Sequence, residues 1–257
     1  MGSAAPWSRL AVVKIQVICP HFEPDSAPTG EFMSAIVNNL GEMGHELHVV
    51  TAPPWYRHHA VEEGWEKKLT QTEKRPWGEI TRVYPFPTDK TNIAARAAAF
   101  MGFSAIGLGS AVTDRFSPDI VFAMSPPLSL GVSGWLAAKR RGVPFVFNIQ
   151  DVFPDVAIET GTITSERVIE AAKKMEKLVY DKADVVTVLS EEMQRNVERK
   201  SASRTEIIPN FVDISTFEPG PKENSYRKEF GLEGKRCLLY TSPSPRDQRG
   251  SRMPSSA

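Results

Sequence analysis

Two side chains able to handle protons follow apolar stretches of the chain. His21 comes after the β-branched run 11–19, and Asp151 comes after the run 143–149. An imidazole or a carboxylate at such a place can accept a proton from a hydroxyl group or hold that hydroxyl in position. Two plainer interpretations stay open: His21 is an exposed loop residue, and Asp151 caps the turn that follows it.

Thr29 and Gly30 stand at the start of segment 30–42, which carries apolar residues at helical spacing. The free N–H groups and the dipole of a helix start favour a phosphate or another anion. The pair therefore predicts either an anion-binding loop or a plain helix cap formed by Thr29.

The motifs give no support for metal or dinucleotide chemistry. His58 and His59 have no carboxylate or cysteine at a metal-ligand spacing, so no metal site is predicted. Neither a Gly-x-Gly-x-x-Gly motif nor a Gly-rich phosphate loop ending in Gly-Lys-Ser/Thr follows the first apolar run. The sequence thus carries no dinucleotide-binding fingerprint.

The composition is that of an ordinary soluble protein, with 41% hydrophobic and 24% charged residues. The 31 lysines and arginines balance the 31 aspartates and glutamates, so no global field attracts nucleic acid. Two cysteines, Cys19 and Cys237, are too few for a disulfide framework. We expect Cys19 to be a packed thiol, and residues 1–9 lack the features of a signal peptide. A cytoplasmic location is the resulting expectation.

Hydrophobic periodicity divides the chain into alternating elements. The predicted strands are 11–19, 46–51, 79–84, 118–123, 143–149, 184–189 and 205–208. The predicted helices are 30–42, 93–112, 127–141, 166–182 and 191–200, followed by a short one at 224–231. This alternation predicts an α/β fold, a Rossmann-like parallel sheet with helices on both faces.

In such sheets ligands bind beyond the carboxyl ends of the strands. That rule points to the loops 20–30, 52–78, 124–128 and 150–161. Segment 52–78 is interpreted as one long loop. Its aromatic residues Trp55, Tyr56 and Trp65 can stack on sugar faces, sit at a lipid interface or fasten the loop to the core.

Segment 93–112 is rich in alanine, and its uncharged part, 97–112, is shorter than the roughly 20 residues of a spanning helix. We therefore predict a helix that covers the sheet. The alternative is a helix that also touches the bilayer surface or a lipid tail.

Four motifs occur in a familiar order. They are TAPPWY at 51–56, SPP at 125–127 with GWL at 134–136, FVFNIQD at 145–151, and IPNFVD at 208–213. Together they resemble the N-terminal half of family 4 glycosyltransferases, in particular the bacterial colanic-acid and O-antigen type. The resemblance covers residues from about Lys14 to Leu239.

The resemblance implies a GT-B fold of two Rossmann-like halves, in which the first holds the acceptor and the second holds the nucleotide-sugar. It implies a retaining, metal-independent transfer to a lipid-linked or saccharide acceptor, with the nucleotide-sugar as co-substrate and no cofactor. Thr29 and Gly30 match the loop that approaches the departing phosphate, and Asp151 matches a position near the acceptor. Ser125 stands where many relatives carry a histidine, and Asn210 falls in the hinge-like stretch between the halves.

The resemblance also divides the chain. Residues 1–213 are expected to form the acceptor-side domain, and 214–240 the truncated start of a donor-binding domain. Residues 241–257 have the composition of a disordered, non-native tail. The basic pair and the glutamate motif of the donor site are missing, so we expect a fragment with little or no transfer activity.

The expected function is sugar transfer in bacterial surface polysaccharide synthesis, with peripheral contact at the inner face of the cell membrane. Two alternatives stay open. The chain is an acceptor-binding module without catalysis, or it is a sugar-nucleotide epimerase, which shares the two-half architecture.

Overall fold

The computed structural model describes residues 11–65, 68–88, 93–211 and 220–235. The chain divides into two compact units, residues 1–211 and 212–257. The second unit contains the short helix α7 (Ser225–Glu229), capped by the side chain of Asn224. Residues 212–219 and 236–257, which include parts of the expected domain start at 214–240 and the whole expected tail at 241–257, lie outside the described residues.

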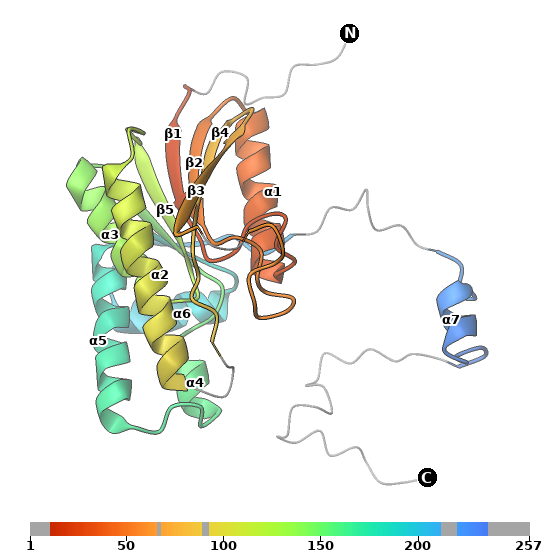
Figure 1. The fold of residues 1–257 in the computed structure, drawn as a ribbon. Helices are drawn as coiled ribbons and strands as arrows, with labels where there is room; N and C mark the ends of the chain where they lie inside the picture. The colour runs from red at the N-terminus through yellow and green to blue at the C-terminus, as the bar shows by residue number, and fades with distance from the viewer. Residues whose placement is uncertain (1–10, 66–67, 89–92, 212–219, 236–257) are drawn as a thin grey trace. The chain divides into compact units, whose positions relative to one another are not determined.

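The first unit is built on one eight-stranded sheet with the order β3-β4-β2-β1-β5-β6-β7-β8 (Figure 1). All neighbouring strands are parallel except β3 and β4. The strands are β1 (Lys14–Ile18), β2 (Glu46–Thr51), β3 (Thr70–Arg75), β4 (Gly78–Val83), β5 (Ile120–Ser125), β6 (Phe145–Ile149), β7 (Val185–Val188) and β8 (Thr205–Ile207). The predicted α/β class is confirmed.

Helices cover both faces of this sheet, and their apolar sides form two core clusters. Their bounds are α1 (Pro28–Glu42), α2 (Ile93–Thr113), α3 (Ser129–Arg141), α4 (Asp155–Glu159), α5 (Glu166–Lys182) and α6 (Glu191–Lys200). Helix α1 packs on one face around Met33 and Val37, while α2, α3 and α5 lie side by side on the other (Figure 1). Cys19 belongs to the α1 cluster, and burial raises the pKa of its thiol to about 12, as expected for a packed thiol.

The interpretation of 52–78 as one loop is wrong, because β3 lies within it and pairs antiparallel with β4. This strand is TQTEKR, and only every second side chain is half-buried. Its charged residues suit the edge of a sheet, where they discourage pairing with another chain. A polar edge strand has no apolar face to reveal it in the sequence.

Thr29 does not cap α1, contrary to one of the two interpretations of the pair. The cap position is Ala27, whose side chain has no acceptor, and Pro28 occupies the first helical position. Proline suits that position because its fixed φ matches a helix and its missing N–H is not needed there. Thr29 and Gly30 therefore lie in the first turn.

The order of the strands places a topological switch point at β1. The chain moves from β1 to β2 on one side, while β5 pairs with β1 on the other. The loops that follow β1 and β5 therefore leave the sheet side by side, and the rule for open α/β sheets puts a ligand between them.

Candidate functional site

A pocket of about 370 Å³ lies at this switch point. Three of the predicted loops, the segment 85–88 that follows β4, the first turn of α1 and the first two turns of α2 contribute to it. Its walls are mostly aromatic and proline side chains, with a few polar groups: Pro20, His21, Pro28, Thr29, Trp55, Tyr56, His59, Pro85, Phe86, Thr88, Arg96, Ala99, Phe100, Pro126 and Pro127. Apolar walls with a few convergent polar groups are the usual make-up of a small-molecule site.

His21 lies in this pocket and is held from two sides. Its Nδ1 lies 2.7 Å from Oδ2 of Asp25, and its ring stacks on Trp55 with 5.4 Å between the ring centroids. Tyr56 meets the same ring edge-on at 5.4 Å. Asp25 was not among the predicted site residues, because no periodicity in a loop reveals which carboxylate will be buried.

The start of α1 also faces the pocket, through Pro28 and Thr29. The first backbone hydrogen bond of the helix runs from the Glu31 N–H to the Ala27 carbonyl. The N–H groups of Thr29 and Gly30 have no acceptor among the described residues, as is usual for a first turn. A Cβ on Gly30 would lie 3.0 Å from the Cβ of His21, so glycine lets the helix approach the loop that carries the histidine.

Arg82 of β4 connects two of the loops that form the pocket. Its Nη2 donates to the carbonyl of Glu23 at 2.6 Å, and its Nη1 donates to the carbonyl of Ala52 at 3.1 Å. Its Nε donates to Glu73 of the edge strand β3, and Trp65 covers the guanidinium at 4.6 Å. The side chain is fully buried. The several N–H groups of a guanidinium let this one cation bind all three acceptors, which a lysine ammonium could not do in the same geometry.

The other predicted site residues form a second group next to the pocket. Ser125 is buried, and its carbonyl accepts a hydrogen bond from the Gln150 N–H at 3.3 Å. The Gln150 side chain bonds to Asn148 at 2.8 Å and accepts from Asn210 at 2.9 Å. Asn210 is thereby fastened to the end of β6 by side-chain amides.

Asp151 is exposed and follows Gln150 directly. Its side chain makes no hydrogen bond within the described part of the chain, and the cap position of α4 is Pro154. The Asp151 side chain therefore does not cap the following helix. That this carboxylate binds a ligand stays a prediction.

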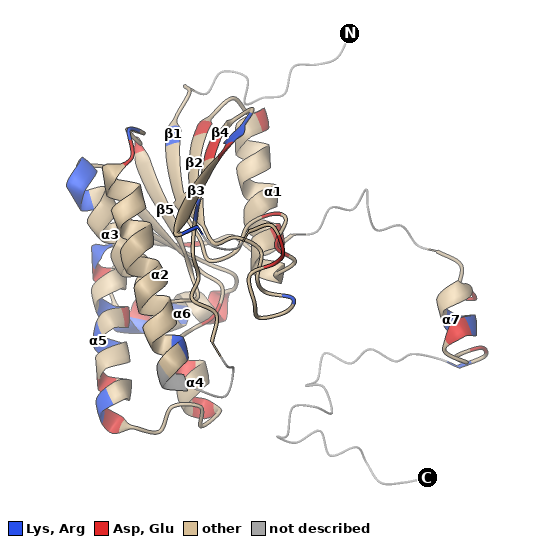
Figure 2. Cartoon of the chain, in the orientation of Figure 1, with Lys and Arg blue, Asp and Glu red and all other residues tan. Residues whose placement is uncertain are grey.

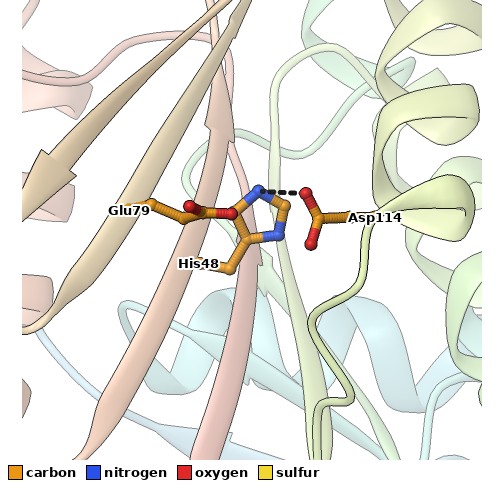
Figure 3. Close-up of side chains that lie close together, drawn as sticks. All are labelled: His48, Glu79 and Asp114. Atoms are coloured by element: carbon orange, nitrogen blue, oxygen red, sulfur yellow. Dashed lines mark ion pairs between the residues drawn. The ribbon is translucent and has the colours of Figure 1, made fainter.

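A third group of ionisable side chains lies near the amino ends of the strands. His48, Glu79 and Asp114 bring their potential ligand atoms within 4.8 Å of one another (Figure 3). Glu79 also forms an ion pair with the exposed Lys74 at 2.6 Å. The sequence suggested no such grouping, since the three residues are far apart in the chain.

The hydrogen bonds of His48 define its protonation and argue for a structural role. The Gln16 Nε2 donates to the carbonyl of Ala111 at 3.1 Å and lies 3.1 Å from His48 Nδ1. Since an amide nitrogen only donates, Nδ1 accepts and the ring hydrogen is on Nε2. That nitrogen lies 2.9 Å from the Thr81 hydroxyl and 3.7 Å from Asp114, so it has no lone pair for a metal ion. Burial lowers the pKa of His48 below its ordinary value.

Fold and pocket define a Rossmann-like domain with a pocket beyond the carboxyl ends of its parallel strands. The chain belongs to the glycosyl transferase 4-like family, because that domain matches residues 29–210. It is similar to WcaI of Escherichia coli K12, a protein named for a colanic acid biosynthesis glycosyl transferase, with 24% identity over 242 residues. The match covers 89% of this chain and 58% of that protein.

Solved structures share the fold. Sucrose-phosphate synthase from Thermosynechococcus elongatus has a TM-score of 0.59 at 16% identity, over 86% of this chain and 53% of that one. HepE from Anabaena, in complex with UDP and glucose, has a TM-score of 0.50 at 14% identity, over 86% of this chain and 50% of that one. The chain thus spans little more than half the length of the relatives it matches.

Proposed function

We propose that this chain is the acceptor-side part of a glycosyltransferase that moves a sugar from a nucleotide-sugar to a lipid-linked or saccharide acceptor. The observation that carries the proposal is the aromatic pocket at the switch point of a glycosyl transferase 4-like domain. The similarity to a protein named for colanic acid biosynthesis supports a role in bacterial surface polysaccharide synthesis.

The donor in this proposal is a nucleoside diphosphate sugar. HepE, which shares the fold, is known in complex with UDP and glucose. The N–H groups at the start of α1, which have no acceptor in the described part of the chain, are suited to the phosphate of such a donor, since a helix start attracts anions. We further propose that transfer retains the anomeric configuration and uses no metal ion, as the family resemblance implies.

The acceptor in this proposal is amphiphilic. The pocket offers stacking surfaces for a sugar ring in Trp55 and Tyr56, and an apolar wall in Phe86 and Phe100. Asp151, Ser125 and Asn210 are assigned to the rim: Asp151 orients an acceptor hydroxyl, and Ser125 and Asn210 hold the Gln150 turn that carries it.

The helix α2 supports a peripheral contact with the membrane. Its segment Ala95–Thr113 is long and apolar enough to cross a membrane by length and composition, although a core helix passes the same test. Met101 is 52% exposed on it, and Figure 2 shows the helix almost free of charged residues, unlike α5. Since Arg96, Ala99 and Phe100 of the same helix line the pocket, an acceptor in a bilayer would be close to its site.

The test uses the purified chain with n-octyl β-D-glucoside, below its critical micelle concentration, as the acceptor mimic. We expect saturable quenching of tryptophan fluorescence, and about fivefold to tenfold weaker binding for Trp55→Ala, since an aromatic stacking surface is lost. Tyr226→Ala, which changes an exposed ring in the second unit, should bind like the parent chain. No saturable binding would contradict the acceptor role.

A second assay separates an enzyme from a binding module. The chain is incubated with a panel of nucleotide-sugars and octyl glucoside, and the release of nucleoside diphosphate is followed together with the disaccharide product. Because the proposed role lies on the acceptor side, we expect acceptor binding with little or no turnover. Clear product formation would show that the chain catalyses transfer and is not a binding module alone.

A further inference from the structure

Arg96 is the single charged residue in the sequence of helix α2, and it lies in the first turn of that helix. No acidic residue accompanies it in that turn. The start of a helix carries the positive end of the helix dipole, so a cation is unfavourable at this place. Such a conflict with a local rule is typical of a residue that is kept for function.

The pocket that Arg96 lines favours an anion. Among its described lining residues Arg96 is a permanent cation, and none is an aspartate or a glutamate. The Asp25 carboxylate contacts His21, but its side chain is fully buried, and its second oxygen accepts the Tyr56 N–H. A negative group in the pocket would therefore meet a guanidinium and no exposed carboxylate.

Aromatic side chains surround this cation on the α2 side of the pocket. Phe100 lies one helical turn after Arg96, and Phe86 comes from the segment that follows β4. Phe86 has a φ of 51°, a strained conformation for a bulky residue, and its ring packs on α2 at Gly102. Backbone strain of this kind is common at ligand sites. An ionic contact gains strength where apolar side chains displace water.

We propose that Arg96 selects an anionic acceptor by binding a phosphate or carboxylate group next to the acceptor sugar. The inference rests on the proposed function, because it names the class of acceptor that the same pocket takes. The sugar ring stacks on Trp55 and Tyr56, and the apolar tail follows Phe86 and Phe100. The planar guanidinium donates two parallel hydrogen bonds to two oxygens of the anion.

This chemistry has two possible sources, a phosphate that joins the sugar to a lipid and the carboxylate of an acidic sugar. The test compares three ligands with the same tail: neutral n-octyl β-D-glucoside, n-octyl β-D-glucuronide and n-octyl phosphate. Isothermal titration calorimetry of the 257-residue chain, with each ligand below its critical micelle concentration, measures the three affinities. We expect at least one anionic ligand to bind about tenfold more tightly than octyl glucoside, the effect of a hydrogen bond to a charged group.

Arg96→Gln should remove this preference and leave the affinity for octyl glucoside unchanged. Arg96→Lys keeps the charge but lacks the planar pair of donors, so it should keep only part of the preference. Arg57→Gln is the matched control, because Arg57 is exposed, follows Tyr56 directly and is not among the residues that line the pocket. It should bind all three ligands like the parent chain. An equal loss of preference in Arg57→Gln overturns the assignment to Arg96.

The parent chain alone can overturn the inference, whether or not a variant folds. Equal affinity for the neutral and the anionic ligands does so and leaves the acceptor role intact, as does a preference that persists in Arg96→Gln. Tighter binding of the glucuronide supports an acidic sugar, and tighter binding of octyl phosphate supports a lipid phosphate. Absence of binding by octyl glucoside contradicts the acceptor role, and the effect of Arg96→Gln on the anionic ligands then reports separately on the anion site.

Discussion

His48 is a buried neutral imidazole whose protonation opposes folding. Its pKa in the folded chain is lowered, first by burial, while Asp114 and Glu79 act in the opposite direction. The unfolded chain therefore takes up a proton at a higher pH than the folded chain. The stability that His48 contributes is complete above its ordinary pKa of 6.5 and is lost as the pH falls below it.

We predict that the free energy of unfolding declines between about pH 7.5 and about pH 5.5 in the parent chain, and declines less in His48→Gln. Urea unfolding at the two pH values measures the difference. His58→Gln serves as the control, because His58 is exposed and should leave the decline unchanged. An equal decline in the parent chain and in His48→Gln would show that other groups cause it.

At the residue scale, the sequence led to part of the site. His21 and Thr29, predicted from their places after a strand and at a helix start, line one pocket. Asp25 and Arg82 were not found, because their roles depend on burial and on contacts between distant loops. Position in a loop predicts which residues can reach a ligand, and only the folded chain reveals what holds them.

Helix α3 is fitted against the sheet at glycine positions. A Cβ on Gly134 would lie 2.5 Å from the Phe145 ring and 2.7 Å from the Cβ of Ala123. Such distances cannot be relieved without moving the helix or the strand, and overpacking of this kind costs about 1–3 kcal/mol. Close contact of α3 with β5 and β6 thus depends on the missing side chain.

We predict that Gly134→Ala lowers the free energy of unfolding by about 1–3 kcal/mol. Gly109→Ala is the matched substitution in α2, where a Cβ would meet nothing within 4 Å. It should leave stability unchanged or raise it by up to about 1 kcal/mol, since alanine favours a helix more than glycine does. Urea unfolding measures the free energy of unfolding of both variants. Similar effects in both would refute the packing argument.

At the element scale, apolar strands were predictable and the polar one was not. The β-branched runs near 14–18, 46–51 and 145–149 became β1, β2 and β6, because burial on both faces demands apolar residues throughout. β3 shows an alternation of polar and charged side chains that is equally typical of a loop. Its pairing with β4 is a tertiary contact and leaves no local signal.

At the scale of the whole molecule, the balance of charges means that any membrane contact depends on apolar surface, which α2 offers. With 31 basic and 31 acidic residues, the chain has no net charge to draw it to an anionic surface. Any membrane contact must then come from apolar side chains that enter the interface. The exposed Met101 lies on the helix that also lines the pocket.

We predict that the chain floats with phosphatidylcholine–phosphatidylglycerol vesicles in a density gradient. Met101→Glu should reduce the bound fraction about tenfold, since it removes an apolar contact and adds a charge. Val168→Glu makes the same chemical change at a 50% exposed site on α5 and should have little effect. Equal loss in both variants, or no flotation of the parent chain, would remove the case for contact through α2.

The edge of the sheet and the pocket share one connection, Arg82. Glu73 of β3 binds this guanidinium, which in turn holds the loops of Glu23 and Ala52. The stability of the pocket walls therefore depends in part on the stability of the hairpin formed by β3 and β4. Whenever β3 opens, Arg82 keeps its bonds to the loops of Glu23 and Ala52 but loses its carboxylate partner, so the buried charge that joins two walls of the pocket is left without its counter-ion.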